Sequence, residues 1–303
     1  MGKVAVMFPG QGAQFVGMGL DFYQNFEESK KVFDLANEAL GFDLKDIIFN
    51  GPEEELKLTK ITQPVILTTS VAIYEAIRDR IKPDAAFGQS LGEYSALTVA
   101  EAIEFKTAVW LVSKRGEYMQ NEVPEGIGAM AAVIGLTVDA VEEVCREAST
   151  RGTVEISNIN SPDQTVISGH KDAVYFAMEI AKQKGAKRCI ELNVSAPFHC
   201  SLIKGAGEKL RKHLLEIDIK EPQIPVLSNV TAQYVTKDNI VDLLEKQVYT
   251  TVNFLGCVNK LLEDGFDTFI EIGPGNVLSG LVRKIKRDLK IVNINKVEDI
   301  KNL

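Results

Sequence analysis

Ser90 lies in a five-residue segment that matches the pattern of a nucleophile elbow. The segment is Gly88-Gln89-Ser90-Leu91-Gly92, which fits G-x-S-x-G. In an elbow the chain turns sharply from a strand into a helix, so the residues two before and two after the serine must be small. An apolar segment expected to form a strand, 84–87, precedes it, and a helical segment follows it. The pattern favours a serine nucleophile for acyl transfer, and a glycine-flanked turn with an N-capping serine is the alternative.

A serine nucleophile needs a general base, and the chain contains three histidines. His213 belongs to a charged helical segment, which is typical of a solvated side chain. His170 follows Ser168-Gly169 at a turn from strand to helix, which indicates a helix-start role. His199 begins a helix where the chain returns to its first domain. We therefore expect His199 to be the base, with a capping or core histidine as the alternative.

An acyl-transfer site also needs hydrogen-bond donors for the oxyanion that develops in the transition state. The geometry of an elbow makes the backbone N–H of Leu91, the residue after the nucleophile, one such donor. The glycines of Pro9-Gly10-Gln11-Gly12 permit the close backbone approach that a second donor needs. A dinucleotide-binding G-x-G-x-x-G motif is not matched here, because Phe15 stands at the third glycine position.

Arg115 lies in an otherwise apolar helical segment that begins Ala108-Val109-Trp110-Leu111-Val112. A surface arginine that extends to solvent is one interpretation. A bidentate clamp for a carboxylate is the other, because the guanidinium fork matches both carboxylate oxygens. The pattern of residues leaves both interpretations open.

Strands alternate with helices along most of the chain, which predicts a mainly parallel sheet covered on both faces. Apolar segments predict strands at 3–8, 84–87, 224–228 and 268–272. Apolar residues at helical spacing predict helices at 27–40, 62–80, 91–100, 105–120, 201–217, 240–247, 254–263 and 277–286. The expected fold class is therefore α/β.

Between residues 125 and 195 the order of elements changes to β-α-β-β-α-β, which is the ferredoxin-like pattern. The two middle strands are joined by Asn160-Ser161-Pro162-Asp163, a strong turn signal. We expect a ferredoxin-like subdomain at 125–195. It would be inserted into a catalytic domain made of residues 1–124 and 196–303.

The composition is typical of a globular protein that does not bind polyanions. The 303 residues carry a formal net charge of −8, which argues against nucleic acid or an anionic membrane as the main partner. The four cysteines form no C-x-x-C pair and no zinc-binding spacing, so we expect reduced thiols in a cytosol-like compartment. The sequence shows neither a signal peptide nor an apolar run long enough to span a bilayer, and we expect a cytoplasmic protein.

Six segments together resemble the malonyl-CoA:acyl carrier protein transacylase family, and the similarity extends across nearly the whole chain. They are Phe8-Pro9-Gly10-Gln11-Gly12-Ala13-Gln14, GQSLGEYSAL at 88–97, Gly128-Ala129-Met130-Ala131-Ala132, residues 158–169, Pro197-Phe198-His199, and EIGPGN at 271–276. The resemblance implies an α/β-hydrolase-like domain with a ferredoxin-like insert. This agrees with the order of elements expected from the residue pattern.

The resemblance also implies roles for individual residues. Ser90 would take the acyl group, and His199 would activate its hydroxyl. The backbone N–H groups of Gln11 and Leu91 would form the oxyanion hole. Gln247 would orient the histidine, in part through its backbone carbonyl, so the site would be a Ser–His dyad rather than a triad with an acidic member.

The implied reaction is a ping-pong transfer between two thioesters. Malonyl-CoA would acylate Ser90, and Arg115 would bind the free carboxylate of the malonyl group. The phosphopantetheine thiol of a holo acyl carrier protein would then take the malonyl group. No metal or redox cofactor is implied.

Two other functions use the same residues differently. A serine thioesterase or esterase would share the elbow, and it would consume malonyl-CoA in the absence of a carrier protein. A non-catalytic carrier-binding protein would not need Ser90, His199 and Arg115 together.

A carrier protein is expected to dock on a local basic patch despite the negative net charge. Solvated helix ends are the alternative interpretation of the two basic clusters, which are Lys182, Lys184, Lys187 and Arg188, or Arg283, Lys284, Lys286 and Arg287.

Overall fold

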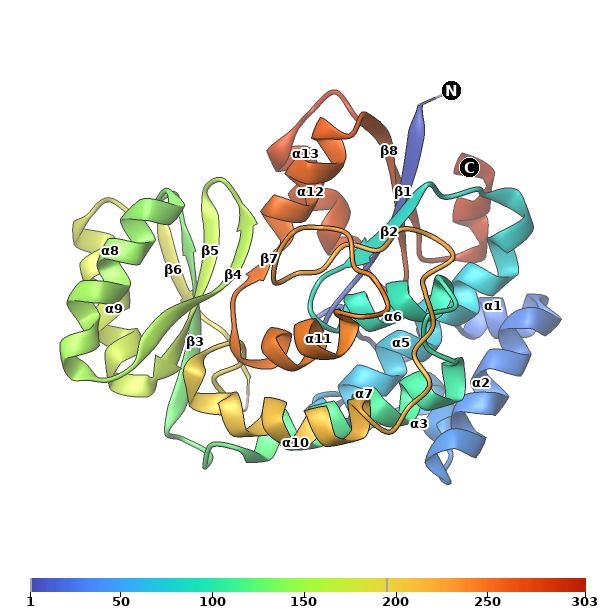
Figure 1. Ribbon diagram of the computed structural model, residues 1–303, viewed down its shortest axis with the longest axis horizontal. Coiled ribbons are helices and arrows are strands. Elements are labelled where there is room, and N and C mark those ends of the chain that lie inside the picture. The colour runs from blue at the N-terminus through green and yellow to red at the C-terminus, as the bar shows by residue number, and fades with distance from the viewer. Residues whose placement is uncertain (1, 195) are drawn as a thin grey trace.

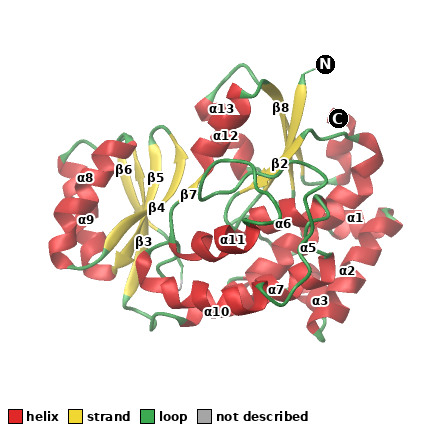
Figure 2. Ribbon diagram, in the orientation of Figure 1, coloured by secondary structure: helices red, strands yellow, loops and turns green. Residues whose placement is uncertain are grey.

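The computed structural model describes residues 2–194 and 196–303, and these residues form two sheets with helices packed around them (Figure 1, Figure 2). The first sheet contains β1 (Lys3–Phe8), β2 (Ala85–Gly88), β8 (Phe266–Ile272) and β9 (Lys290–Ile294), in the order β2-β1-β8-β9. All three strand pairs in it are parallel. The expected α/β fold with a mainly parallel sheet is confirmed.

Side chains alternate between the two faces of this sheet, as the pleat of a strand requires. Val6 and Phe8 of β1 belong to one hydrophobic core, whereas Ala5 and Met7 belong to another on the opposite face. Because both faces are covered, β1 is apolar at successive positions rather than at every second one.

Helices cover each face of the first sheet. The core around Ala5 and Met7 is completed by α12 (Phe254–Glu263) and α13 (Val277–Ile285). The core around Val6 and Phe8 includes α5 (Thr59–Ile77) and α6 (Leu91–Val99). On this side lie further helices, which are α1 (Leu20–Asn25), α2 (Glu27–Leu40), α3 (Leu44–Asn50), α4 (Glu53–Leu56), α7 (Phe105–Asn121), α10 (Lys204–Leu214) and α11 (Ile240–Tyr249).

The second sheet forms the lobe on the left of Figure 1. It contains β3 (Gly128–Ile134), β4 (Val154–Ser161), β5 (Gln164–His170), β6 (Arg188–Glu191) and β7 (Val252–Asn253), in the order β6-β3-β5-β4-β7. The first four strands pair antiparallel, with α8 (Val138–Ala148) and α9 (Lys171–Gln183) against one face. This is the expected ferredoxin-like arrangement, and Ser195, where the insert was expected to end, lies outside the described residues.

The two lobes are joined by a strand pair as well as by the chain. The short strand β7, which follows α11 of the large lobe, pairs parallel with β4 through Asn158–Val252 and Ile159–Asn253. Asn158 therefore lies at a fixed position against the large lobe.

Two of the expected elements differ most from the structure, which also contains the unexpected strand β9 and the unexpected helices α1, α3 and α4. The prediction of a continuous strand at 224–228 is wrong. Only isolated bridges form there, between Val226 and Ala86 and between Leu227 and Tyr234. Pro225 has no N–H to donate to a ladder, which limits the pairing. The helix expected at 201–217 begins instead as a 3-10 turn, Ser201–Ile203, and α10 ends at Leu214.

Among the described residues, no helix has both the length and the apolar character needed to cross a membrane.

Candidate active site

Ser90 occupies a sharp turn between Gly88, the last residue of β2, and Leu91, the first of α6. Its φ is 53° and its ψ is −107°, a conformation that is strained for a residue other than glycine. A Cβ at Gly88 would collide with the backbone of Gly92, and a Cβ at Gly92 would collide with the carbonyl oxygen of Phe8. The two glycines therefore let the turn close against β1 and leave the Ser90 side chain clear of the sheet.

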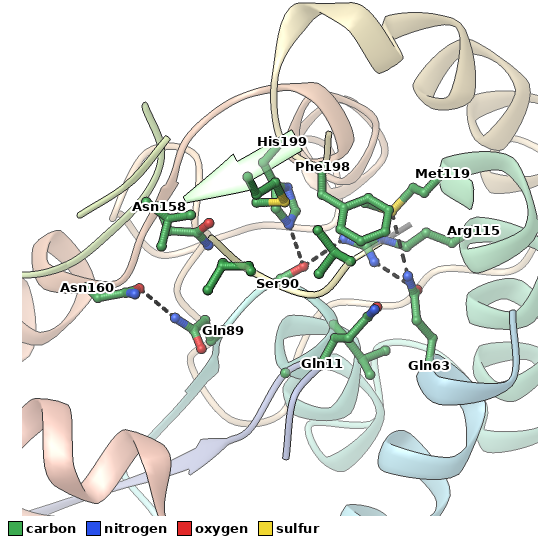
Figure 3. Close-up of a pocket in the computed structure, with 16 residues that line it drawn as sticks. Gln11, Gln63, Gln89, Ser90, Arg115, Met119, Asn158, Asn160, Phe198 and His199 are labelled. Carbon is green, nitrogen blue, oxygen red and sulfur yellow. Dashed lines mark hydrogen bonds between the residues drawn. The ribbon is translucent and has the colours of Figure 1, made fainter. Parts of the chain in front are cut away.

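The hydroxyl of Ser90 contacts the imidazole of His199. The distance from Ser90 Oγ to His199 Nε2 is 2.8 Å (Figure 3). The distance from His199 Nδ1 to the backbone oxygen of Gln247 is 2.7 Å. A carbonyl oxygen only accepts hydrogen bonds, so Nδ1 carries the proton and Nε2 is free to accept the proton of Ser90. The third partner is a carbonyl rather than a carboxylate, so these residues form a dyad.

The environment keeps His199 neutral. Its side chain is almost fully buried, and burial lowers the pKa of the imidazole to about 3. The positive charge of Arg115 contributes to this lowering of the pKa, whereas the hydrogen bond to Gln247 opposes it. The imidazole is therefore unprotonated at neutral pH and able to accept a proton.

Arg115, from α7, reaches the same hydroxyl from the other side. Its side chain is 1% exposed, so the interpretation as a solvent-exposed surface arginine is wrong. Nη2 donates to Ser90 Oγ at 3.0 Å and to Gln247 Oε1 at 2.9 Å, and Nη1 donates to Gln63 Oε1 at 2.8 Å. No acidic side chain in residues 2–194 and 196–303 forms an ion pair with this guanidinium.

Ser90, His199 and Arg115 line a cavity of about 170 Å³ between the two lobes (Figure 3). Gln11 and Leu91, the expected oxyanion donors, line it as well. The volume is below the ~300–1,000 Å³ of pockets for drug-sized ligands, so the cavity suits a short acyl group. Its wall on the side of the ferredoxin-like lobe includes Met130, Asn158, Asn160 and Val166.

Gln89 links the elbow to the second lobe. Its side-chain Nε2 donates to Asn160 Oδ1 at 2.6 Å, so the residue beside the nucleophile contacts β4 across the cavity. Phe198 and Met119 add apolar surface to the lining.

The other two histidines lie outside this cavity. His170 is the N-cap residue of α9, the expected helix-start position, but its side chain makes no capping hydrogen bond there, and its Nδ1 accepts the N–H of Thr153 at 3.0 Å instead. His213 contacts the hydroxyl of Tyr118, with 2.8 Å between Nε2 and Oη. Within the described part of the chain, no group of three or more His, Cys, Asp or Glu side chains is arranged to hold a metal ion.

Several polar residues around Ser90 are not predicted from the sequence, among them Asn229, Gln63 and Glu93. Asn229 Oδ1 accepts the N–H of Ser90 at 2.7 Å, and its Nδ2 donates to the carbonyl of Gly88 at 2.8 Å, so this side chain fixes the elbow. Gln63 is buried on α5, directly before the apolar residues Pro64–Leu67. An amide beside such an apolar run is the one sequence signal that could have drawn attention to it.

Glu93 lies in the first turn of α6 and is 1% exposed. Its Oε2 accepts the backbone N–H of Asn229 at 2.9 Å and Nε2 of Gln247 at 2.6 Å. Burial raises the pKa of this carboxyl to about 7, and both hydrogen bonds and the charge of Arg115 act in the opposite direction. A carboxylate in the apolar run Leu91–Val99 is the signal that could have identified it.

Comparison with known proteins agrees with this geometry. The sequence matches the family described as "Acyl transferase domain" over residues 6–301. A malonyl CoA-acyl carrier protein transacylase of Bacillus subtilis is 48% identical over 303 residues, which cover 99% of this chain and 96% of that protein.

Solved structures give the same result. A malonyl CoA-acyl carrier protein transacylase from Clostridium perfringens has a TM-score of 0.96 and 47% identity, over 99% of this chain and 95% of that one. A malonyl-transacylase in complex with a holo type II PKS acyl-carrier protein has a TM-score of 0.96 and 40% identity, over 99% of this chain and 98% of that one. The present chain therefore belongs to the acyl transferase domain family.

Proposed function

We propose that this protein transfers a malonyl group from malonyl-CoA to the phosphopantetheine thiol of an acyl carrier protein, through an ester on Ser90. The observation that carries the proposal is the buried guanidinium of Arg115, whose Nη2 lies 3.0 Å from Ser90 Oγ. A short acyl group that ends in a carboxylate would meet this cation when attached to Ser90. The names of the similar proteins support the same donor and acceptor.

In the first half-reaction, His199 Nε2 takes the proton of Ser90 as Oγ attacks the thioester carbon of malonyl-CoA. The carbonyl oxygen becomes an oxyanion, which the backbone N–H groups of Gln11 and Leu91 stabilise. As the intermediate collapses, the C–S bond breaks and His199 returns the proton to the sulfur of CoA. The products are free CoA and malonyl-Ser90.

The second half-reaction repeats these steps with a different nucleophile. The thiol of the carrier's phosphopantetheine gives its proton to His199, and the thiolate attacks the ester carbon of malonyl-Ser90. The C–O bond breaks, and His199 returns the proton to Ser90 Oγ. A thioester replaces a thioester, so the protein only has to lower both barriers and exclude water.

Arg115 would bind the malonyl carboxylate and also tune the base. In the empty site Nη2 donates to Ser90 Oγ, and a bound carboxylate would take over this donor. The charge of Arg115 lowers the pKa of His199, and a bound carboxylate would compensate that charge. The histidine would then be a stronger base with malonyl-CoA bound than with acetyl-CoA bound.

A carrier protein would dock beside α13 rather than beside the end of α9. Arg283, Lys284 and Arg287 line a hollow together with Pro162 and Asp163, the turn that follows Asn158 and Asn160 of the cavity wall. Near the end of α9, Lys184 already pairs with Glu143 and Glu147. The α13 cluster, which is Arg283, Lys284 and Arg287, forms no ion pair within the described residues, and it suits the phosphodiester of a phosphopantetheine arm.

Three further proposals accompany this function. The catalytic domain comprises residues 1–124 and 196–303, and the ferredoxin-like subdomain comprises 125–195. The reaction uses no metal or redox cofactor. The protein acts in the cytoplasm, where free CoA thioesters are available.

Isolation of an acylated Ser90 peptide would test the proposed function most directly. Incubation with malonyl-CoA should add one malonyl group to the intact mass of the wild-type protein and none to that of Ser90→Ala. Addition of a holo carrier protein should remove the group from the wild type and transfer it to the carrier thiol. Turnover of malonyl-CoA at the same rate without a carrier protein would identify a thioesterase instead.

A further inference from the structure

We propose that Glu93 is a positioning residue that fixes the orientation of the Gln247 amide, and through it both the Arg115 clamp and the His199 base. This inference rests on the proposed malonyl transfer. It adds a residue that neither approaches the acyl group nor lines the cavity.

Gln247 is the point where three groups of the site meet. Its backbone oxygen accepts from His199 Nδ1 at 2.7 Å, and its side-chain Oε1 accepts from Arg115 Nη2 at 2.9 Å. Its Nε2 donates to the backbone oxygen of Ser90 at 3.0 Å. One buried amide therefore contacts the nucleophile's backbone, the guanidinium, and, through its main chain, the base.

The orientation of that amide is set by acceptors for both of its hydrogens, the backbone oxygen of Ser90 and the carboxylate of Glu93, and the contact with Glu93 is the shorter of the two. Glu93 Oε2 receives Nε2 of Gln247 at 2.6 Å, and a guanidinium can only donate. If the amide turned over, its oxygen would face the carboxylate of Glu93 and its NH₂ would face the donors of Arg115. The carboxylate thus keeps Oε1 directed at Arg115 and holds the guanidinium where a malonyl carboxylate would find it.

The same oxygen also holds the elbow. Glu93 Oε2 accepts the backbone N–H of Asn229 at 2.9 Å, and the Asn229 side chain accepts the N–H of Ser90 and donates to Gly88. Glu93 lies three residues after Ser90, so the helix α6 brings its side chain beneath the nucleophile. A single carboxylate oxygen therefore binds the side chain of Gln247 and the main chain of Asn229, and both of these residues hydrogen-bond the backbone of Ser90.

The experiment compares kcat and KM for malonyl-CoA and acetyl-CoA in four proteins: wild type, Glu93→Gln, Glu93→Asp and Glu93→Leu. Glutamine retains an acceptor oxygen at the same reach, aspartate withdraws it by one methylene, and leucine removes it. We expect Glu93→Leu to raise the KM for malonyl-CoA and to lower the malonyl-to-acetyl ratio of kcat/KM at least about tenfold. Glu93→Gln should keep the ratio near that of the wild type, and Glu93→Asp should lie between.

Glu271 provides the matched control. It is also fully buried and accepts two backbone N–H groups, those of Leu278 at 3.0 Å and Ser279 at 2.8 Å, but it does not line the cavity. Glu271→Leu should reduce the amount of folded protein and leave the malonyl-to-acetyl ratio unchanged. The control separates loss of a buried carboxylate from loss of the orientation of Gln247.

A folded Glu93→Leu protein with the wild-type ratio would overturn the proposal, as would a Glu93→Gln protein as impaired in the ratio as Glu93→Leu. If the leucine variant does not fold, the aspartate and glutamine variants decide, and equal ratios in these two would count against a role for the acceptor. Absence of malonyl transfer by the wild type in the same assay would contradict the proposed function itself.

Discussion

At the scale of single residues, Arg115 is the residue that would separate malonyl from acetyl. A carboxylate brought into a buried cavity loses several kcal/mol of hydration unless a cation meets it. Hydrogen bonds to charged groups contribute roughly 1.5–3 kcal/mol each, so Arg115→Ala should lower kcat/KM for malonyl-CoA about 100-fold or more. Acetyl transfer makes no such contact and should be unchanged or faster, because a buried charge without an anionic partner is removed.

The lysine variant serves as the control for charge alone. Arg115→Lys retains a cation but not the fork that donates to Gln63, Gln247 and Ser90, so it should recover only part of the malonyl rate. The measurement is kcat/KM for malonyl-CoA and acetyl-CoA in the wild type and both variants. A proportional fall for the two substrates would make Arg115 structural and would place the dicarboxylate specificity elsewhere.

The buried His199 should also be visible in the dependence of stability on pH. In the unfolded chain its pKa is about 6.5, and in the folded protein burial lowers it to about 3. Between these values the unfolded state binds the additional proton, so the free energy of unfolding falls as the pH falls through this window. From pH 7 to pH 5 the contribution of this group is about 2 kcal/mol, because the slope approaches about 1.4 kcal/mol per pH unit only below pH 6.5.

Urea unfolding at pH 7 and pH 5 would measure this contribution. His199→Gln should lose less stability than the wild type on acidification, and Ser90→Ala, which keeps the histidine, should behave like the wild type. An identical loss in the wild type and His199→Gln would show that the imidazole is not held neutral in the folded protein.

The sequence allowed some of these residues to be predicted because their types are rare and their local context is distinctive. Ser90 has flanking glycines, and the chain offers three histidines from which to choose a base. Arg115 remained open because burial is a property of the tertiary structure. Asn229 and Gln63 come from a loop and a helix far from Ser90 in sequence, and no local pattern indicates that they meet it.

At the scale of elements, the turn between β2 and α6 depends on Gly92 having no side chain. A Cβ there would collide with the carbonyl oxygen of Phe8 on β1, so the helix would have to move away from the sheet. Gly92→Ala should therefore destabilise the protein by about 1–3 kcal/mol and prevent acylation of Ser90. Thermal unfolding and the mass of the malonyl-enzyme would measure the two effects.

Gly280 of α13 is the matched control, because a Cβ at that position would meet no atom within 4 Å. Gly280→Ala should leave acylation intact and stabilise the protein by roughly 0.5–1 kcal/mol, the ordinary preference of a helix for alanine. If Gly92→Ala behaved like Gly280→Ala, the close approach of α6 to β1 would not be needed for the elbow.

The elements that were predicted well are those with a strong apolar period. The strand Lys3–Phe8 and the helices Glu27–Leu40 and Phe254–Glu263 have the expected bounds. The edge strand β9 was not predicted, because Lys290–Ile294 is short and its exposed positions weaken the apolar signal. The segment 224–228 was predicted as a strand because it is apolar. Whether Pro225 interrupts the hydrogen bonds of a strand depends on which side the neighbouring strand lies, and this is a property of the tertiary structure.

At the scale of the whole molecule, the candidate site is assembled from both lobes. Ser90, His199 and Arg115 come from the large lobe, whereas Asn158 and Asn160 of β4 complete the wall. The contacts of Gln89 with Asn160 and of β7 with β4 hold the lobes together at this position. The order of elements along the chain predicted both lobes, in agreement with the resemblance to a known family, but the residues that meet across the cavity follow only from their packing.

The final prediction concerns docking of the carrier protein on the surface that both lobes share. The net charge of −8 disfavours any anionic partner at long range, so productive encounters require a local cationic surface. Arg283 and Arg287 of the α13 cluster adjoin Pro162 and Asp163 of the ferredoxin-like lobe. Arg283→Glu combined with Arg287→Glu should therefore raise the KM for the carrier protein and leave the KM for malonyl-CoA unchanged.

Lys187→Glu combined with Arg188→Glu, at the other basic cluster, is the matched control and should have the smaller effect. Salt screens attraction between exposed charges, so added salt should raise the carrier KM of the wild type more than that of the α13 variant. Initial rates at varied carrier and malonyl-CoA concentrations, at low and high ionic strength, measure both effects. An equal rise in the two KM values would indicate that the α13 cluster binds the phosphates of CoA, and a larger effect of the Lys187 and Arg188 substitutions would place docking beside α9.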